Sequence, residues 1–176
     1  TFEEAAAVPH CALAALFYLQ KAKIKKGQKV LVCGAAGGIG TFAVQIAKEF
    51  GAEVTGVCST ANLDLVKSLG AEKVIDYTKE SIGRSSDTYD VIFDTVNTIA
   101  ISRSLQSLSK NGIMILSAAG MPEMIQGLWI SKTSNRKVLT GVISHTAADI
   151  IFLKELVEAG KLKPVIDRTY PLEQIA

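Results

Sequence analysis

The sequence lacks the features that mark several large classes of protein. Its formal net charge is only +2, which gives no reason to expect a nucleic-acid partner. No apolar run approaches the roughly 20 residues that cross a membrane, and no signal-peptide pattern is present, so we expect no membrane association. Apolar side chains are plentiful, at 48% of 176 residues, which excludes disorder and suffices for a substantial core.

Cysteine and histidine are also scarce. The three cysteines, Cys11, Cys33 and Cys58, are scattered and form no C-x-x-C pair. Cys33 and Cys58 lie in apolar, strand-like segments, so we interpret them as buried side chains rather than metal ligands. We interpret the two histidines, His10 and His145, as packing or helix-start residues. The sequence therefore predicts no metal site and a reducing compartment, which we take to be the cytoplasm.

The two ends of the chain suggest a piece of a longer polypeptide. The chain begins at Thr1 without methionine, directly in an apolar helical pattern that we expect to be interrupted near Pro9. It stops at "PLEQIA", where Pro171 has the place of a first helical residue. We expect residues 1–28 to be a helical lead-in and residues 29–176 to be one domain, truncated at its C-terminal end.

From residue 29 onward, strand-like and helix-like segments alternate. The predicted strands are 29–33, 53–59, 73–77, 89–95, 112–118 and 137–143. The predicted helices are 38–50, 63–70 and 99–108. A further helix is predicted to run through Ala159, with Thr146 and Asp149 forming a capping box at its start. Asn111-Gly112 is predicted to be a turn, and residues 119–136 form the least regular stretch, with a short helix. This alternation predicts an α/β fold, a doubly wound parallel sheet (Rossmann fold) in three α/β/α layers, with strand order 3-2-1-4-5-6.

The turn after the first predicted strand is rich in small residues. In "VCGAAGGIG", Ala35, Ala36, Gly37 and Gly38 leave room for a pyrophosphate beside the first N–H groups of the following helix, whose dipole favours an anion. Gly40 is expected to let this helix pack against the strand. The stretch therefore predicts a dinucleotide site.

Two dehydrogenase fingerprints fit this turn equally well. Aligned on its last glycine, "AAGGIG" is an AxGxxG variant of the dinucleotide fingerprint, and "GAAGGIG" also fits the GxxxGxG of short-chain dehydrogenases. Those enzymes require Tyr-x-x-x-Lys, and none of the four tyrosines here has a lysine four residues later. The short-chain family is therefore disfavoured.

The second predicted strand indicates which dinucleotide is bound. NAD sites usually have an acid at the end of this strand, but "VCSTAN" has none before Asp64. Ser59, Thr60 and Asn62 instead offer neutral groups where a 2′-phosphate could lie. The sequence therefore favours NADP(H), and the missing acid also weakens a methyltransferase alternative.

The ordered set of segments resembles the cofactor domain of a zinc-independent medium-chain dehydrogenase/reductase of the quinone oxidoreductase branch. The segments that carry the resemblance are "EEAAAVPHCALAALFYL", "GAAGGIGTFAVQIAKEFGAEVTGVCST", "LVKSLGAEKVIDYTKE", "YDVIFDTV", "LSKNGIMILSAAG" and "LVEAGKLKPVIDRTYPLEQIA". The resemblance implies cofactor contacts at Ala36, Gly37, Gly38 and Ile39 (pyrophosphate), at Ser59, Asn62 and Tyr77 (2′-phosphate), and at Thr95, Val96, Ser117 and Ala118 (toward the nicotinamide). It also implies that a GroES-like domain would precede Thr1.

Two positions depart from the pattern of the family. Relatives often have threonine where this chain has Ala14, and close relatives commonly have arginine where it has Ala61. The loss of that arginine should weaken binding of a 2′-phosphate.

The resemblance implies an oxidoreductase that transfers a hydride from NADPH to a small-molecule substrate, a quinone or an activated alkene or carbonyl. We assign no catalytic residue within the chain and expect the isolated domain to turn over little or not at all. The alternatives are a non-enzymatic nucleotide-sensing or scaffold domain, or an enoyl-reductase module of a larger synthase. The resemblance also implies a homodimer through the 137–143 edge strand, since relatives dimerise by pairing this edge, which leaves no backbone donors open.

Overall fold

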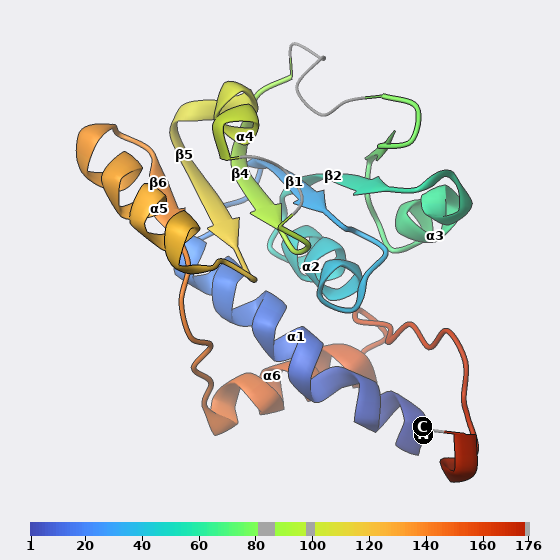
Figure 1. The fold of residues 1–176 in the computed structure, drawn as a ribbon. Coiled ribbons are helices and arrows are strands. Elements are labelled where there is room, and N and C mark those ends of the chain that lie inside the picture. Colours follow the sequence, from blue (N-terminus) through green and yellow to red (C-terminus); the bar gives the residue numbers. More distant parts are fainter. Residues whose placement is uncertain (81–86, 98–100, 175–176) are drawn as a thin grey trace.

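The computed structural model describes residues 1–80, 87–97 and 101–174 of the chain. Its centre is a six-stranded sheet in the order β3-β2-β1-β4-β5-β6, and every pair of neighbouring strands is parallel (Figure 1). The strands are β1 Lys29–Cys33, β2 Glu53–Cys58, β3 Lys73–Asp76, β4 Tyr89–Asp94, β5 Leu108–Leu116 and β6 Lys137–Leu139. The predicted fold class and strand order are confirmed.

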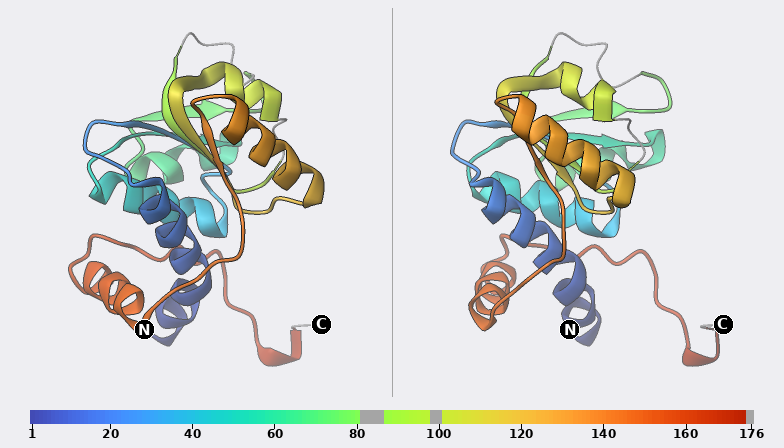
Figure 2. Two further views of the ribbon diagram at one scale, coloured as in Figure 1. Left: turned by 90° about the vertical axis from the view of Figure 1, so that its left-hand side faces the viewer. Right: turned by 60° about the vertical axis from the view of Figure 1, so that its left-hand side comes forward.

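Helices cover both faces of this sheet. They are α1 Phe2–Ala22, α2 Gly38–Glu49, α3 Leu63–Ser68, α4 Ile101–Ser107, α5 Met121–Thr133 and α6 Ala147–Glu158, with 3₁₀ turns at Thr60–Asn62 and Leu172–Gln174. Buried side chains of α1, α2, α3 and α6 belong to one core cluster, and those of α4 and α5 belong to the other. Figure 2 shows α6 lying beside α1, away from α5.

The alternation of side chains along the strands builds these two clusters. In β1, Val30 and Val32 pack into the cluster of α1 and α2, whereas Leu31 and Cys33 pack into the cluster of α4 and α5. A strand that is buried on both faces has to be apolar at every position, which explains its unbroken apolar sequence. Cys33 and Cys58 are both buried free thiols, as predicted.

The predicted interruption near Pro9 is wrong, because α1 runs without a break through this residue. Proline removes a backbone N–H, but two features stabilise the helix on either side of it. A capping box between Thr1 and Glu4 holds the first turn, and the half from Ala12 onward is buried.

The second half of the sheet differs from the sequence prediction in detail. Asn111-Gly112 is not a separate turn but part of β5, where the pairing with β4 shifts register between Tyr89 and Val91. The strand β6 ends at Leu139 rather than at residue 143, and the expected short helix is the 13-residue α5. The capping box of Thr146 and Asp149 at the start of α6 is confirmed.

Parts of three predicted segments lie outside the described residues: most of the polar stretch 81–88, the first residues of the helix predicted from 99, and the last two residues of the chain. Among the helices that the structure does describe, none is long and apolar enough to cross a membrane.

Candidate functional site

The loops that follow the strands bring the predicted site residues to one edge of the sheet. Because all strands are parallel, the segments after β1 to β5 meet at the carboxyl edge, where doubly wound folds bind their ligands. The structure describes all twelve predicted residues and places them in these segments: Ala36, Gly37, Gly38, Ile39, Ser59, Thr60, Asn62, Tyr77, Thr95, Val96, Ser117 and Ala118. Their contact with a cofactor stays a prediction.

The first turn of α2 is open to a ligand. Gly37 is the N-cap, no side chain caps the helix, and the first turn contains no acid. Gly37 and Gly38 are exposed, while Ala36 and Ile39 are half-buried. The first N–H groups of a helix have no partner within it, and its dipole is positive there, so this end suits a pyrophosphate.

Two other glycines of the turn are needed for packing. A Cβ at Gly40 would overlap the carbonyl oxygen of Gly34, so the close approach of α2 to β1 requires glycine, as predicted. Gly34 has φ of 73°, and a Cβ there would lie 2.7 Å from Oγ1 of Thr95. Gly34 and Gly40 therefore shape the turn, whereas Gly37 and Gly38 are the glycines that the turn exposes.

Hydrogen bonds link the residues that follow β2 to the end of β3. The Thr60 hydroxyl donates to Oδ2 of Asp76, and Nδ2 of Asn62 donates to Oγ of Ser59 over 3.1 Å. The Thr60 hydrogen is thus directed at a carboxylate in this structure, whereas the Ser59 hydroxyl hydrogen is free to point at a ligand. Tyr77 is 61% exposed directly beside this corner, with its backbone N–H bonded to Cys58.

Asp76 is a residue of this corner that sequence reasoning missed. Its side chain is buried and also accepts from the Thr78 hydroxyl (2.7 Å) and the Thr78 N–H (3.0 Å), while Nζ of Lys79 lies 3.6 Å from Oδ2. The hydroxyls of Thr60 and Thr78 lower the pKa of Asp76 to about 2. The corner therefore holds a carboxylate that is ionised at neutral pH.

A second missed acid, Asp94, supports the loop after β4. It is fully buried, and Oδ1 accepts the backbone N–H groups of Val96 (3.0 Å) and Asn97 (2.9 Å). Thr95 donates its hydroxyl to the carbonyl oxygen of Cys33 (2.8 Å), and the Ser117 N–H donates to that of Asp94 (3.2 Å). The available signal was an acid at the last position of a predicted parallel strand, which both Asp76 and Asp94 share.

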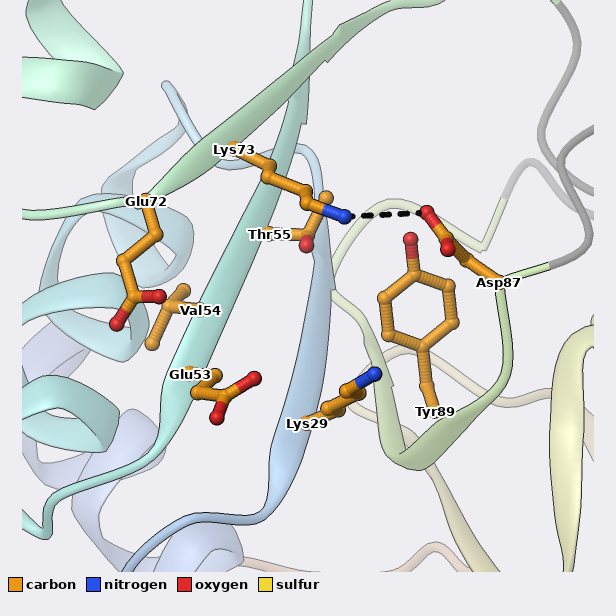
Figure 3. A pocket seen from close by; sticks show the side chains of 8 residues that line it. All are labelled: Lys29, Glu53, Val54, Thr55, Glu72, Lys73, Asp87 and Tyr89. Atoms are coloured by element: carbon orange, nitrogen blue, oxygen red, sulfur yellow. Dashed lines mark hydrogen bonds and ion pairs between the residues drawn. The ribbon is translucent and has the colours of Figure 1, made fainter.

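The amino edge of the same sheet has a different kind of pocket. Figure 3 shows it lined by Lys29, Glu53, Val54, Thr55, Glu72, Lys73, Asp87 and Tyr89, with the Tyr89 hydroxyl pointing toward the ion pair of Lys73 and Asp87 (3.5 Å). Its volume is about 60 Å³, whereas sites for small organic ligands span roughly 300–1,000 Å³. The pocket is therefore too small for a dinucleotide.

The cysteines and histidines are distributed over several elements: His10 and Cys11 in α1, Cys33 in β1, Cys58 in β2, and His145 before α6. His10 and His145 are both exposed, and His145 directly precedes the N-cap Thr146 of α6. Cys11 is half-exposed, and its Sγ would lie 2.9 Å from a Cβ at Gly38. Throughout the described ranges, no group of three or more His, Cys, Asp or Glu side chains could hold a metal ion.

The strand order and the helices on both faces are those of the doubly wound α/β class, whose members bind ligands at the carboxyl edge of the sheet. The profile of the zinc-binding dehydrogenase family matches residues 69–176, more than half of the chain. The chain therefore belongs to this family of medium-chain dehydrogenases/reductases, and quinone oxidoreductases are among the proteins that it resembles.

Individual relatives agree with this assignment. The chain is 34% identical to a mitochondrial NAD(P)H oxidoreductase of Mus musculus over 202 residues, which cover 99% of this chain and 51% of the relative. It is 37% identical to the 2-methylene-furan-3-one reductase of Solanum lycopersicum, in an alignment that covers 97% of this chain and 41% of that relative. The chain thus spans about half the length of the curated relatives it matches.

Solved structures show the same architecture. The quinone oxidoreductase of Coxiella burnetii superimposes with a TM-score of 0.87 at 28% identity, covering 96% of this chain and 53% of the other. The Escherichia coli quinone oxidoreductase complexed with NADPH gives a TM-score of 0.79 at 26% identity, and the superposition covers 94% of this chain and 56% of the other.

Proposed function

We propose that the chain is the NADP(H)-binding domain of an oxidoreductase that transfers a hydride from NADPH to a quinone or to an activated alkene or carbonyl. The observation that carries this proposal is the uncapped, acid-free start of α2, which lies in the same carboxyl edge as the neutral groups that follow β2. The relatives support the substrate class, since one is a reductase of a methylene-furanone and another is a quinone oxidoreductase with NADPH.

The residues of this chain would bind NADPH and orient its nicotinamide. Ala36 to Ile39 would hold the pyrophosphate, and Ser59, Asn62 and Tyr77 would surround the adenosine 2′-phosphate. Thr95 and Ser117 are fixed by hydrogen bonds to the ends of β1 and β4, so they present a rigid surface along which the nicotinamide would lie. NADPH supplies the hydride when it is bound, and we assign no catalytic group to the chain.

The proposed preference for NADPH rests on the residues after β2. An acid at the end of this strand would repel a 2′-phosphate, and the segment that begins at Ser59 is neutral up to Asp64. Asp76 adds a negative charge from the neighbouring strand, and Lys79 offsets it.

The test is NADPH oxidation by the protein that contains this chain, followed at 340 nm with a panel of quinones and enones, and with NADH as the comparison cofactor. Turnover of at least one of these substrates with NADPH supports the proposal. Cofactor binding without turnover across the panel would favour the nucleotide-sensing or scaffold alternative. Turnover confined to carrier-bound enoyl thioesters would favour the enoyl-reductase module.

We also propose that the chain forms a homodimer through the β6 edge of the sheet. β6 is the last strand in the sheet order, and α5 beside it exposes the apolar side chains of Met121, Ile125, Leu128 and Trp129. A monomer at micromolar concentration in sedimentation velocity would contradict this proposal. We retain the cytoplasm as the proposed compartment because the three cysteines are free thiols.

A further inference from the structure

The corner between the ends of β2 and β3 receives no cation from the β2 side. Ser59, Thr60, Ala61 and Asn62 are all neutral. The Thr60 hydroxyl is not available to donate to a ligand, because it donates to Asp76. A phosphate that is bound only by neutral groups receives no hydrogen bond from a cationic donor. Such charge-assisted hydrogen bonds are about twice as strong as those between neutral groups.

Lys79 reaches this corner from the β3 side. Its Nζ lies 3.6 Å from Oδ2 of Asp76, the oxygen that also accepts the Thr60 hydroxyl. The turn that carries Lys79 is fixed, since the backbone N–H groups of Lys79 and Glu80 both donate to the carbonyl oxygen of Asp76 over 3.0 Å. The Lys79 side chain is 68% exposed, so its ammonium is open to a ligand.

We propose that Lys79 is the cation that binds the 2′-phosphate of NADPH and is therefore the residue that sets the preference for NADPH over NADH. This inference rests on the proposed function, namely that the carboxyl edge binds a nicotinamide dinucleotide.

The charges of the corner explain why the effect should be selective. Asp76 is an anion at neutral pH, because the Thr60 and Thr78 hydroxyls lower its pKa to about 2. Lys79 neutralises this carboxylate and holds an attractive charge beside it. Without Lys79, the carboxylate would repel a 2′-phosphate, whereas the 2′-hydroxyl of NADH can donate a hydrogen bond to an acid.

The experiment compares Lys79→Gln with Lys67→Gln, a matched change of an exposed lysine in the last turn of α3. Calorimetry on the full chain gives the Kd of each cofactor at about 50 and 500 mM salt, which differ strongly in screening. Lys79→Gln should weaken NADPH binding about 10-fold, and at least about five-fold more than NADH binding. Its NADPH affinity should also depend less on salt than that of the wild type. Lys79→Arg should retain the preference, and Lys67→Gln should change neither Kd by more than about two-fold.

The outcomes separate this inference from the function on which it rests. A wild-type chain that binds neither cofactor would overturn both. Suppose that the wild type prefers NADPH. If Lys79→Gln leaves both affinities unchanged, or weakens NADPH and NADH binding by the same factor, only the role of Lys79 is overturned. Equal wild-type affinities for NADPH and NADH would overturn the NADP assignment and the role of Lys79, but would leave a dinucleotide site in place.

Discussion

The two edges of the sheet are built from the same strands but offer different chemistry. At the carboxyl edge, glycines leave the start of α2 open, and the loops carry hydroxyl groups and buried acids that hydrogen bonds hold in place. At the amino edge, charged side chains of both signs surround a pocket of about 60 Å³. The difference follows from strand direction, since in a parallel sheet every helix that follows a strand begins at the carboxyl edge and presents its unpaired N–H groups there.

The largest effect on stability is expected at Gly40. Gly40→Ala would place a methyl group against the carbonyl oxygen of Gly34, which is backbone and cannot rotate away, so stability should fall by about 3 kcal/mol. Gly27, in the loop at the amino edge, is the comparison: its φ is 80° but nothing lies within 4 Å of an added Cβ. Gly27→Ala should therefore cost only about 1 kcal/mol, from the left-handed backbone alone. Urea unfolding measures the free energy of unfolding of both variants. Equal losses of stability in Gly40→Ala and Gly27→Ala would contradict the packing role of Gly40.

The next largest effect concerns cofactor affinity at Gly37. Aspartate is a favoured N-cap, so Gly37→Asp should not destabilise α2, but it would put a carboxylate where the pyrophosphate is proposed to bind. NADPH and NADH should both bind about 100-fold more weakly, as measured by calorimetry. Gly37→Asn supplies a neutral cap of the same size and should lose less than about 10-fold. Equal losses for the two variants would mean that bulk rather than charge decides the effect.

A smaller effect is expected from Asp76, and it depends on pH. The pKa of Asp76 is lowered from 3.8 to about 2 in the folded chain, so its ionised form stabilises the fold. This contribution is fully present above about pH 4 and is lost as the pH falls toward about 2. Asp76→Asn should therefore be less stable than the wild type at pH 7, and the gap in urea midpoint should narrow between pH 4 and pH 3. A gap that stays constant would exclude titration of Asp76 as its cause.

The smallest effect is expected at Tyr89, on the amino edge. Its ring is buried, but its hydroxyl has no hydrogen-bond partner among the described residues, so Tyr89→Phe should change stability by less than about 0.5 kcal/mol. Tyr18 is also buried and donates to the carbonyl oxygen of Gly141 over 2.8 Å, so Tyr18→Phe should cost about 1 kcal/mol or more. Thermal unfolding compares the two variants, and a larger loss at Tyr89 would show that its hydroxyl is bonded after all. NADPH affinity should not change in Tyr89→Phe.

The first half of the sheet followed closely from its sequence. Apolar runs such as 30–33 and the glycine turn that follows this run have strong local signals, and the observed bounds differ from the expected ones by no more than two residues. The second half followed less closely, because its signals conflict. Asn111-Gly112 has turn chemistry, yet pairing with β4 keeps it inside β5. Outside the sheet, the break predicted at Pro9 is absent because α1 packs as one helix.

The sequence by itself determined the strand order and the glycine-rich turn after β1. These depend on local periodicity, on the small size of glycine and on the rule that parallel strands need crossover helices. The tertiary structure alone decided which side chains of the carboxyl edge act on one another. Asp76 and Lys79 meet Thr60 only because β3 pairs with β2, and a contact between segments that are distant along the chain leaves no periodic signal in either of them.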